Sequence, residues 1–443
     1  MALATALLPM TASAQSAREA ELEARIAQLE QTVAELVAAQ RAGAASPMPA
    51  PAPATPATPP AAPPPAPAVA QATPIVPGAP AGTRFSVGGM IKYDAMYTDT
   101  TDGEIAEGST GRLFYLPGAI PVGSAGEPNG DFNSSARFSR LWLSIDSQTD
   151  AGNTLKAFFE ADFFGGGGSA LGNEVATNTH GLTLRHAYVQ WNNWLAGQTW
   201  SNFQDVGVLP DSVDFIGPSE GTVFARQAQV RYSNGPWTVS IENPESVITP
   251  LHGNGTRIVS DDNAVPDVTA RWTHRGDRGH FSAAGLVRQL RQETPTSQAQ
   301  GIGAGVSLSG KHNIGASDDI RWMLTGGRGI SRYVGFALGT DGVIDQGGDI
   351  DATGMLAGFV AWRHVFNQQL RGNLFYSRAE YDNDVALTGP GITRSAQSIH
   401  ANLIYSPLPK LDVGAELIFG RRTIESGESG DLRRLHTHIR YSF

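Results

Sequence analysis

The sequence predicts an all-β protein, a transmembrane antiparallel β-barrel of about 16 strands preceded by a short periplasmic coiled coil. Segments of about 9–11 residues that alternate apolar and polar side chains recur over residues 84–443, as expected of strands that cross a membrane at a tilt. The last segment, residues 432–443 (LRRLHTHIRYSF), alternates in the same way, and a closed barrel pairs such a strand on both edges. No run of about 20 apolar residues predicts a membrane helix.

The composition agrees with this class and excludes others. The chain has 443 residues, a net charge of −10 and no cysteine. The acidic balance argues against a nucleic-acid-binding protein, and the absence of cysteine excludes disulfides and thiolate metal sites. Glycine is abundant, with 51 residues, and there are 8 Trp, 10 Tyr and 18 Phe. Glycine-containing strands and aromatic girdles are both typical of membrane barrels.

The first segment, residues 1–14, resembles a signal peptide. A short apolar stretch ends in Ala12-Ser13-Ala14, which matches the small-residue pattern of a cleavage site. The basic residues that usually open such a peptide are missing, so we expect the true start of the peptide to lie upstream.

Residues 18–41 form a predicted coiled-coil oligomerisation helix. Apolar residues recur at spacings that alternate between four and three: Leu22, Ile26, Leu29, Val33 and Leu36. Arg18 and Arg25 each precede a glutamate by five residues, which is the spacing of interchain ion pairs in a parallel coil. Branched residues at a with Leu at d favour a dimer. A single amphipathic helix docked on a domain is the alternative.

Residues 42–83 are almost entirely Ala, Pro, Thr and Gly. Proline opposes both helix and sheet, so this segment is a predicted extended, semi-rigid linker.

The predicted barrel, residues 84–443, has polar faces that suit a water-filled lumen. Lys156, Glu160 and Asp162 alternate with apolar residues in one strand. A soluble sandwich would bury these charges unpaired, which is costly, whereas a wide barrel leaves them in water. Short turns at residues 147–152, 233–236 and 406–410 are expected at the periplasmic end, and the long loops 98–135, 165–181, 201–221, 243–266 and 327–352 at the other end.

Arginine supplies nearly all positive charge within the strands. Lysine occurs at four positions, whereas nine arginines fall in or beside predicted strands: Arg137, Arg140, Arg185, Arg226, Arg231, Arg271, Arg288, Arg321 and Arg371. A guanidinium stays charged at any working pH and meets a carboxylate with two parallel hydrogen bonds. Arginines that line a constriction would therefore favour small anions. The bland alternatives are a base composition that favours arginine over lysine, and arginines that sit at the rim or at a subunit contact.

Four segments resemble the DcaP-like outer-membrane porins. They are FSVGGMIKYDAMY (residues 85–97), GRLFYLPGAIPVG (111–123), LRHAYVQWNNWLAGQTWSNF (184–203) and LPDSVDFIGPSEGTVFARQAQVRY (209–232). The order of signal, coil, linker and barrel matches as well. The resemblance implies a sixteen-stranded homotrimeric channel for passive diffusion of small anions, with dicarboxylic acids favoured. It also implies that the loop of residues 201–221 bends into the pore. The implied trimer differs from the dimer that the coil favours, and the larger barrel contact makes the trimer our expectation.

Within this architecture, candidate constriction residues cluster in sequence around the inward loop. On the barrel wall they are Arg137, Arg140, Arg185, Arg226 and Arg231. On the loop they are Asp205, Asp211 and Asp214. Opposed charges of this kind would set a transverse field at the narrowest point.

No catalytic residue, metal site or cofactor is predicted. His436 and His438 lie two apart on a strand, and a lumen or rim position explains them better than metal binding. The glycine runs lack the helix that a phosphate-binding loop requires, and the acidic loops lack calcium-loop spacing. A closed-barrel surface structural or adhesive protein, a barrel hydrolase and a phosphate-type anion channel are the alternatives to the dicarboxylate porin.

The expected location is the bacterial outer membrane, with the coil in the periplasm. Expected partners are two further copies of the chain, outer-membrane lipid and lipopolysaccharide, and small anionic solutes. The terminal strand, which ends on Phe443, resembles the signal that such barrels present to the barrel assembly machinery. No nucleic-acid partner is expected.

Overall fold

A computed structural model describes residue 31 and residues 82–123, 126–149, 151–165 and 177–443. The predicted signal peptide, coiled coil and linker lie outside these residues, apart from Gln31 and residues 82–83. Among the described residues, no helix is both long enough and apolar enough to cross a membrane.

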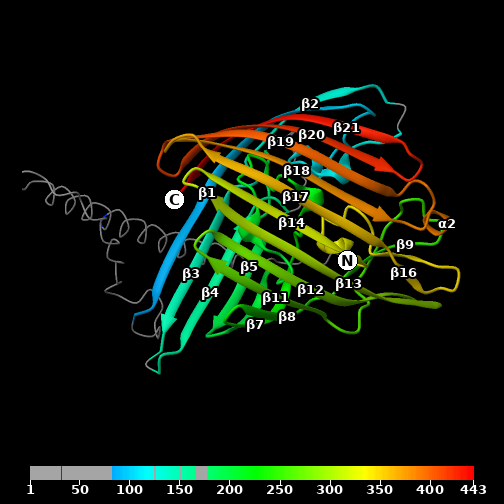
Figure 1. The fold of residues 1–443 in the computed structure, drawn as a ribbon, viewed down its shortest axis with the longest axis horizontal. Coiled ribbons are helices and arrows are strands. Elements are labelled where there is room, and N and C mark those ends of the chain that lie inside the picture. Colours follow the sequence, from blue (N-terminus) through cyan, green and yellow to red (C-terminus); the bar gives the residue numbers. More distant parts are fainter. Residues whose placement is uncertain (1–30, 32–81, 124–125, 150, 166–176) are drawn as a thin grey trace, which may run out of the picture. The chain divides into compact units, whose positions relative to one another are not determined.

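The main body is a closed antiparallel barrel (Figure 1). Its wall strands are β1 (Arg84–Thr100), β2 (Asn129–Ser135), β3 (Arg140–Gln148), β4 (Thr154–Asp162), β5 (Thr183–Trp191), β6 (Trp194–Trp200), β7 (Arg226–Asn234), β8 (Trp237–Glu242), β11 (Asp267–Gly276), β12 (Gly279–Thr294), β13 (Ser297–Ile314), β14 (Asp318–Arg328), β17 (Gly354–Val365), β18 (Leu370–Asp382), β19 (Thr393–Leu408), β20 (Leu411–Ile424) and β21 (Ser429–Ser442).

These 17 strands occupy 16 positions in the wall, because β2 and β3 pair with different halves of β1. The terminal strand β21 closes the barrel against β1, from Ser442 opposite Met90 to Leu432 opposite Thr100. Closure satisfies the backbone of every wall strand without a free edge, which a membrane requires. The predicted sixteen-stranded barrel is confirmed.

Side-chain alternation along each strand separates a lipid face from a lumen face. In β20, Val413, Leu417 and Phe419 are 41–49% exposed on the outside. Gly414, Glu416 and Ile418 alternate with them and are buried on the inside. Apolar-out and polar-in alternation of this kind is the pattern of a membrane barrel.

The two ends of the barrel differ. Short turns connect β3 to β4, β5 to β6, β7 to β8 and β19 to β20, and long loops connect strands at the opposite end. Near the short turns, an outward aromatic row follows neighbouring strands, with Trp191 opposite Trp194, Trp194 opposite Tyr232, and Trp237 opposite Trp272. Short turns and aromatic girdles identify the periplasmic end.

The long loops fold back into the lumen. They contain η1 (Thr110–Arg112), η2 (Pro117–Ala119), η3 (Val206–Val208), η4 (Ser219–Gly221), η5 (Ser331–Tyr333), α2 (Val385–Thr388) and a small sheet of β9 (Ser246–Thr249), β10 (Ile258–Ser260), β15 (Gly342–Ile344) and β16 (Ile350–Ala352). Phe114 is buried and its ring lies 5.5 Å from that of Phe215 and 5.3 Å from that of Phe336. Three loops thus share one aromatic core.

Candidate functional site

The loop between β6 and β7, residues 201–225, turns inward and is bonded to the wall along its length. Asp205 begins η3 by accepting a hydrogen bond from the Gly207 amide at 3.0 Å. Its carboxylate also accepts bonds from His280 Nε2 at 2.8 Å and Ser309 Oγ at 2.9 Å. Burial alone would raise the pKa of Asp205, but the hydrogen bond and charge of His280, followed by Ser309 and Gly207, lower that pKa below its usual range. Asp205 is therefore an anchor.

Asp214 is a second anchor, buried against another loop. Its carboxylate accepts hydrogen bonds from the Tyr115 amide at 2.8 Å and the Gly217 amide at 3.2 Å. His436 Nδ1 lies 3.3 Å from the same carboxylate. With 3% of its surface exposed, Asp214 meets the loop fold rather than the water in the lumen.

The tip of the loop is held by β20 and β1. Glu416 accepts hydrogen bonds from the Val213 amide at 2.7 Å and from His400 Nδ1 at 2.7 Å. Lys92 Nζ donates to the Val213 carbonyl at 2.9 Å and pairs with Asp94 at 2.8 Å. These buried contacts fix where the next carboxylate along the loop, Asp211, meets the wall.

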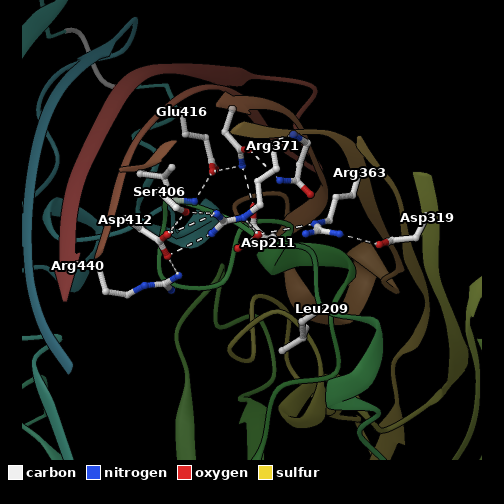
Figure 2. Close-up of polar contacts among 12 residues, drawn as sticks. Leu209, Asp211, Asp319, Arg363, Arg371, Ser406, Asp412, Glu416 and Arg440 are labelled. Atoms are coloured by element: carbon white, nitrogen blue, oxygen red, sulfur yellow. Dashed lines mark hydrogen bonds and ion pairs between the residues drawn. The ribbon is translucent and has the colours of Figure 1, made fainter. Parts of the chain in front are cut away.

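Asp211 faces a row of wall charges that we call the periplasmic belt. The belt consists of five cations and three carboxylates: Lys311, Arg321, Arg363, Arg371 and Arg440, with Asp211, Asp319 and Asp412. In Figure 2 the guanidinium groups of Arg363, Arg371 and Arg440 point from the wall toward Asp211 and Asp412. Each of the eight side chains is between 5 and 30% exposed. Five positive and three negative charges leave a formal excess of two positive charges.

The belt arginines are oriented by shared carboxylates. Arg371 Nε donates to Asp211, and its Nη2 lies 3.2 Å from Asp412. Arg363 Nη1 lies 3.4 Å from Asp319, whose other oxygen accepts from Arg321 Nε at 2.6 Å. Such bridges hold the guanidinium planes in place, and each arginine keeps donors that a passing anion can use.

A second group of arginines lies on β3, β5 and β7. Arg185 is 3% exposed and donates to Glu160 and Asp162, each at 2.7 Å. Arg140 Nη1 lies 3.4 Å from Glu160. The Arg226 guanidinium lies 5.0 Å from the centre of the Trp200 ring, a cation–π distance. Three cations share two carboxylates here.

Arg231 and Arg271 add charge without a counterion. Arg231 Nε donates to Gln229 Oε1 at 3.0 Å, and Arg271 Nη1 donates to the Gln204 carbonyl at 2.6 Å. Both arginines are half-buried. Within the part of the chain that the structure describes, neither forms an ion pair with a carboxylate.

Arg137 stands apart from the other predicted residues. It lies in the break between β2 and β3, where its Nε donates to His180 Nε2 at 2.9 Å. It lines an outer groove of about 790 Å³ that Ile91, Tyr93 and Phe132 also line.

The structure thus brings Arg140, Arg185 and Arg226 together and places Asp211 among arginines that were not selected from the sequence. Those arginines, Arg321, Arg363, Arg371 and Arg440, lie on inward positions a few residues from short turns. Inward parity and distance from a short turn would have found them. Among the described residues, no group of three or more His, Asp and Glu side chains is arranged to hold a metal ion.

Comparison with known proteins agrees with the barrel. The chain superposes on the outer membrane channel DcaP of Acinetobacter baumannii with a TM-score of 0.66 and 23% identity, covering 82% of this chain and 98% of that one. An OmpT loop-deletion mutant from Vibrio cholerae gives a TM-score of 0.50 and 12% identity, covering 82% and 99%.

Sequence comparison assigns the family. Among curated proteins, none matches this sequence. A family model described as DcaP outer membrane protein matches residues 74–443, nearly the whole barrel and the end of the linker. The chain therefore belongs to the DcaP outer membrane protein family and is a protein of the bacterial outer membrane with a porin fold.

Proposed function

We propose that the barrel is a porin through which small anionic solutes diffuse passively, with dicarboxylic acids the favoured class. The carrying observation is the excess of arginine over carboxylate along the lumen. The periplasmic belt has two more cations than carboxylates, and Arg231 and Arg271 have no carboxylate partner among the described residues. Fixed positive charge along a water path lowers the energy of an anion and raises that of a cation.

The arrangement also suits solutes with two anionic groups. Arg363 and Arg371 flank Asp211 on neighbouring strands, and Arg440 lies beyond Asp412. A dicarboxylate can exchange one guanidinium for the next while its second carboxylate stays bound, since each guanidinium presents a fork that fits a carboxylate. A phosphate-type anion would use the same donors and is the nearest alternative solute.

We propose further that three copies of the chain assemble. The wall is low where β3, β4, β5 and β6 have only seven to nine residues, compared with 16 and 18 in β12 and β13. The outer groove beside Arg137 opens at this low wall and exposes Ile91, Tyr93 and Phe132. Contact with a second copy would cover apolar surface there, and native mass spectrometry of the detergent-extracted protein would give the number of copies.

A second function has one specific observation in its favour. The extracellular half of the lumen contains packed side chains from several loops, among them Phe114, Tyr115 and Tyr333, each at most 1% exposed. A permanently closed barrel with a structural or adhesive role would need such packing. This alternative predicts a folded protein without conductance.

The deciding experiment is the reversal potential of the purified protein in a planar bilayer under a salt gradient. We expect stepwise conductance with anion preference, and a larger succinate than potassium permeability. Channels that prefer cations would refute the anion assignment. A correctly folded protein that conducts nothing would refute the channel and favour the structural role.

A further inference from the structure

We propose that the outer face of β19, β20 and β21 binds a phosphorylated lipid of the outer leaflet, with Arg421 and Arg433 as the phosphate ligands. The site faces away from the lumen, so it goes beyond the transport of solutes. Its test does not depend on conductance, and either proposal can fail while the other stands.

The strand register places the site at the upper edge of the apolar belt. Tyr376, Ile399 and Phe419 lie opposite one another on β18, β19 and β20, and each is 42–49% exposed on the outside. Two residues nearer the extracellular end, Arg378 lies opposite Gln397, and Gln397 lies opposite Arg421. The change from apolar to polar side chains therefore occurs at one level on neighbouring strands, as at a boundary between acyl chains and headgroups.

Arg433 is the unusual residue at this boundary. It lies opposite Phe419 in the register, within the apolar row, and its side chain is exposed on the outer face. Asp99 lies opposite it on β1, but Arg433 forms no ion pair or hydrogen bond with any described residue. A charge that faces lipid without a counterion is costly. The long arginine stem lets the guanidinium reach the headgroup level, where a lipid phosphate supplies the missing charge.

Arg421 supplies a second cation and is already oriented. Its Nε and Nη2 donate to the two oxygens of Asp431 at 2.6 and 2.8 Å, and its side chain is 53% exposed. Its Nη1 makes no hydrogen bond to the described residues and is available to a ligand. Asp431 thus fixes the guanidinium plane beside Arg433.

A groove joins these arginines to apolar surface. It has a volume of about 320 Å³ and is lined by Ile399 and Phe419 toward the membrane middle and by Gln397, Arg421 and Arg433 toward the outside. Tyr376 lines this groove and also a neighbouring one of about 340 Å³ that contains Leu356 and Val360. A ligand with acyl chains below and a phosphate above matches both halves, whereas free phosphate would leave the apolar half empty.

The test uses the full chain in detergent and diphosphoryl lipid A as the probe, with native mass spectrometry as the readout. We expect retained lipid on the wild-type protein, and an about tenfold weaker affinity for the double variant R421Q/R433Q, because two charge-assisted hydrogen-bonding groups are lost. Arg328→Gln is the matched control. Arg328 is an exposed outer-rim arginine, 55% exposed, that already pairs with Asp351 and Asp382.

Four outcomes decide the proposal. Weaker lipid A binding by the double variant, with unchanged binding by the control variant, supports it. Equal binding by all three proteins would overturn it. Equal displacement of the lipid by inorganic phosphate would also overturn it, since the apolar half would then contribute nothing. If the double variant does not fold, as judged by heat-modifiable electrophoretic mobility, the single variant R433Q gives the same comparison.

Discussion

Asp211 and Arg371 are 160 residues apart in the sequence and meet inside the barrel, where the Arg371 Nε donates to the Asp211 carboxylate. One comes from the inward loop and the other from β18. Because the tip of the loop is bonded to Glu416 and Lys92, this pair sets the position of the loop charge relative to the belt. The belt is therefore the part of the lumen where a single substitution should change selectivity most directly.

Arg371→Gln should reduce the preference for anions. The substitution keeps hydrogen-bonding ability and removes one of five belt cations. A unit charge at 4 Å is worth about 1 kcal/mol in water, so we expect an about fivefold fall in the anion-to-cation permeability ratio. Reversal potentials under a salt gradient measure it. Arg421→Gln, on the outer face, is the control and should leave the ratio unchanged. An unchanged ratio for R371Q would remove the belt from the selectivity site.

Asp211→Asn should have the opposite effect. It removes the carboxylate that Arg371 and Arg363 share, and both guanidinium groups would then face the lumen with less compensation. We expect the anion preference to rise by a similar factor, about fivefold. Single-channel recordings in potassium succinate, compared with potassium chloride, would show whether the gain extends to dicarboxylates. A fall in anion preference would mean that Asp211 is not at the conducting surface.

Arg185 should behave differently from Arg226, although both were predicted as wall residues. Arg185 is buried and bonded to Glu160 and Asp162, so Arg185→Ala would leave two carboxylates without their partner. Breaking such a buried pair costs about 3–5 kcal/mol. We expect a lower temperature for the loss of heat-modifiable mobility in R185A. Arg226→Gln, which removes a cation stacked on Trp200, should retain stability and lower the anion preference. Equal stability of the two variants would contradict this assignment.

The sequence predicted the barrel because period-two alternation is local. In β20 the outward residues can be read directly from the spacing of Val413, Leu417 and Phe419. The same spacing gives the side of the wall on which an arginine lies but does not give its height in the lumen. Arg371 belongs to the belt because it is the second residue of β18, directly after a periplasmic turn.

Two features of the site could not be read from alternation. A bulge between Glu160 and Ala161 lets both Arg185 and His186, which are sequence neighbours, lie buried on the inside, whereas regular pleating would place one of them outside. The roles of the loop aspartates depend on contacts across the barrel. Asp205 and Asp214 became anchors because His280 and Tyr115 reach them, and Asp211 faces the belt because Arg371 and Arg363 do.

The Asp205 anchor should make the loop sensitive to acid. The pKa of Asp205 in the folded protein is below its usual value of about 3.9, so the stabilisation is complete above that value and is lost as pH falls through the folded pKa. We expect steady single-channel current from about pH 7 to about pH 4, and increased current noise below that range. Asp205→Asn should be noisy throughout. Asp384→Asn, which removes the cap of α2 in another loop, should match the wild type, and a quiet D205N channel would contradict the anchor.

Arg288 should hold a second loop in the lumen. Its side chain is fully buried, with Nη1 3.1 Å from Asp341 of that loop and Nε 3.3 Å from Asp267 of β11. Asp267 also accepts a hydrogen bond from Tyr333 at 2.7 Å. Arg288→Met keeps the length of the side chain but leaves two buried carboxylates without their cation, at a cost of about 3–5 kcal/mol.

Because Asp341 lies in the loop and Asp267 in the wall, the barrel can relieve this cost by releasing the loop of residues 329–353 into the vestibule. We therefore expect R288M to keep its heat-modifiable mobility, to become sensitive to proteases within that loop, and to conduct more than the wild type. Arg291→Met is the matched control, since Arg291 lies on the same strand and pairs with the exposed Glu293. Wild-type protease resistance together with wild-type conductance in R288M would show that the loop is held by its apolar contacts instead.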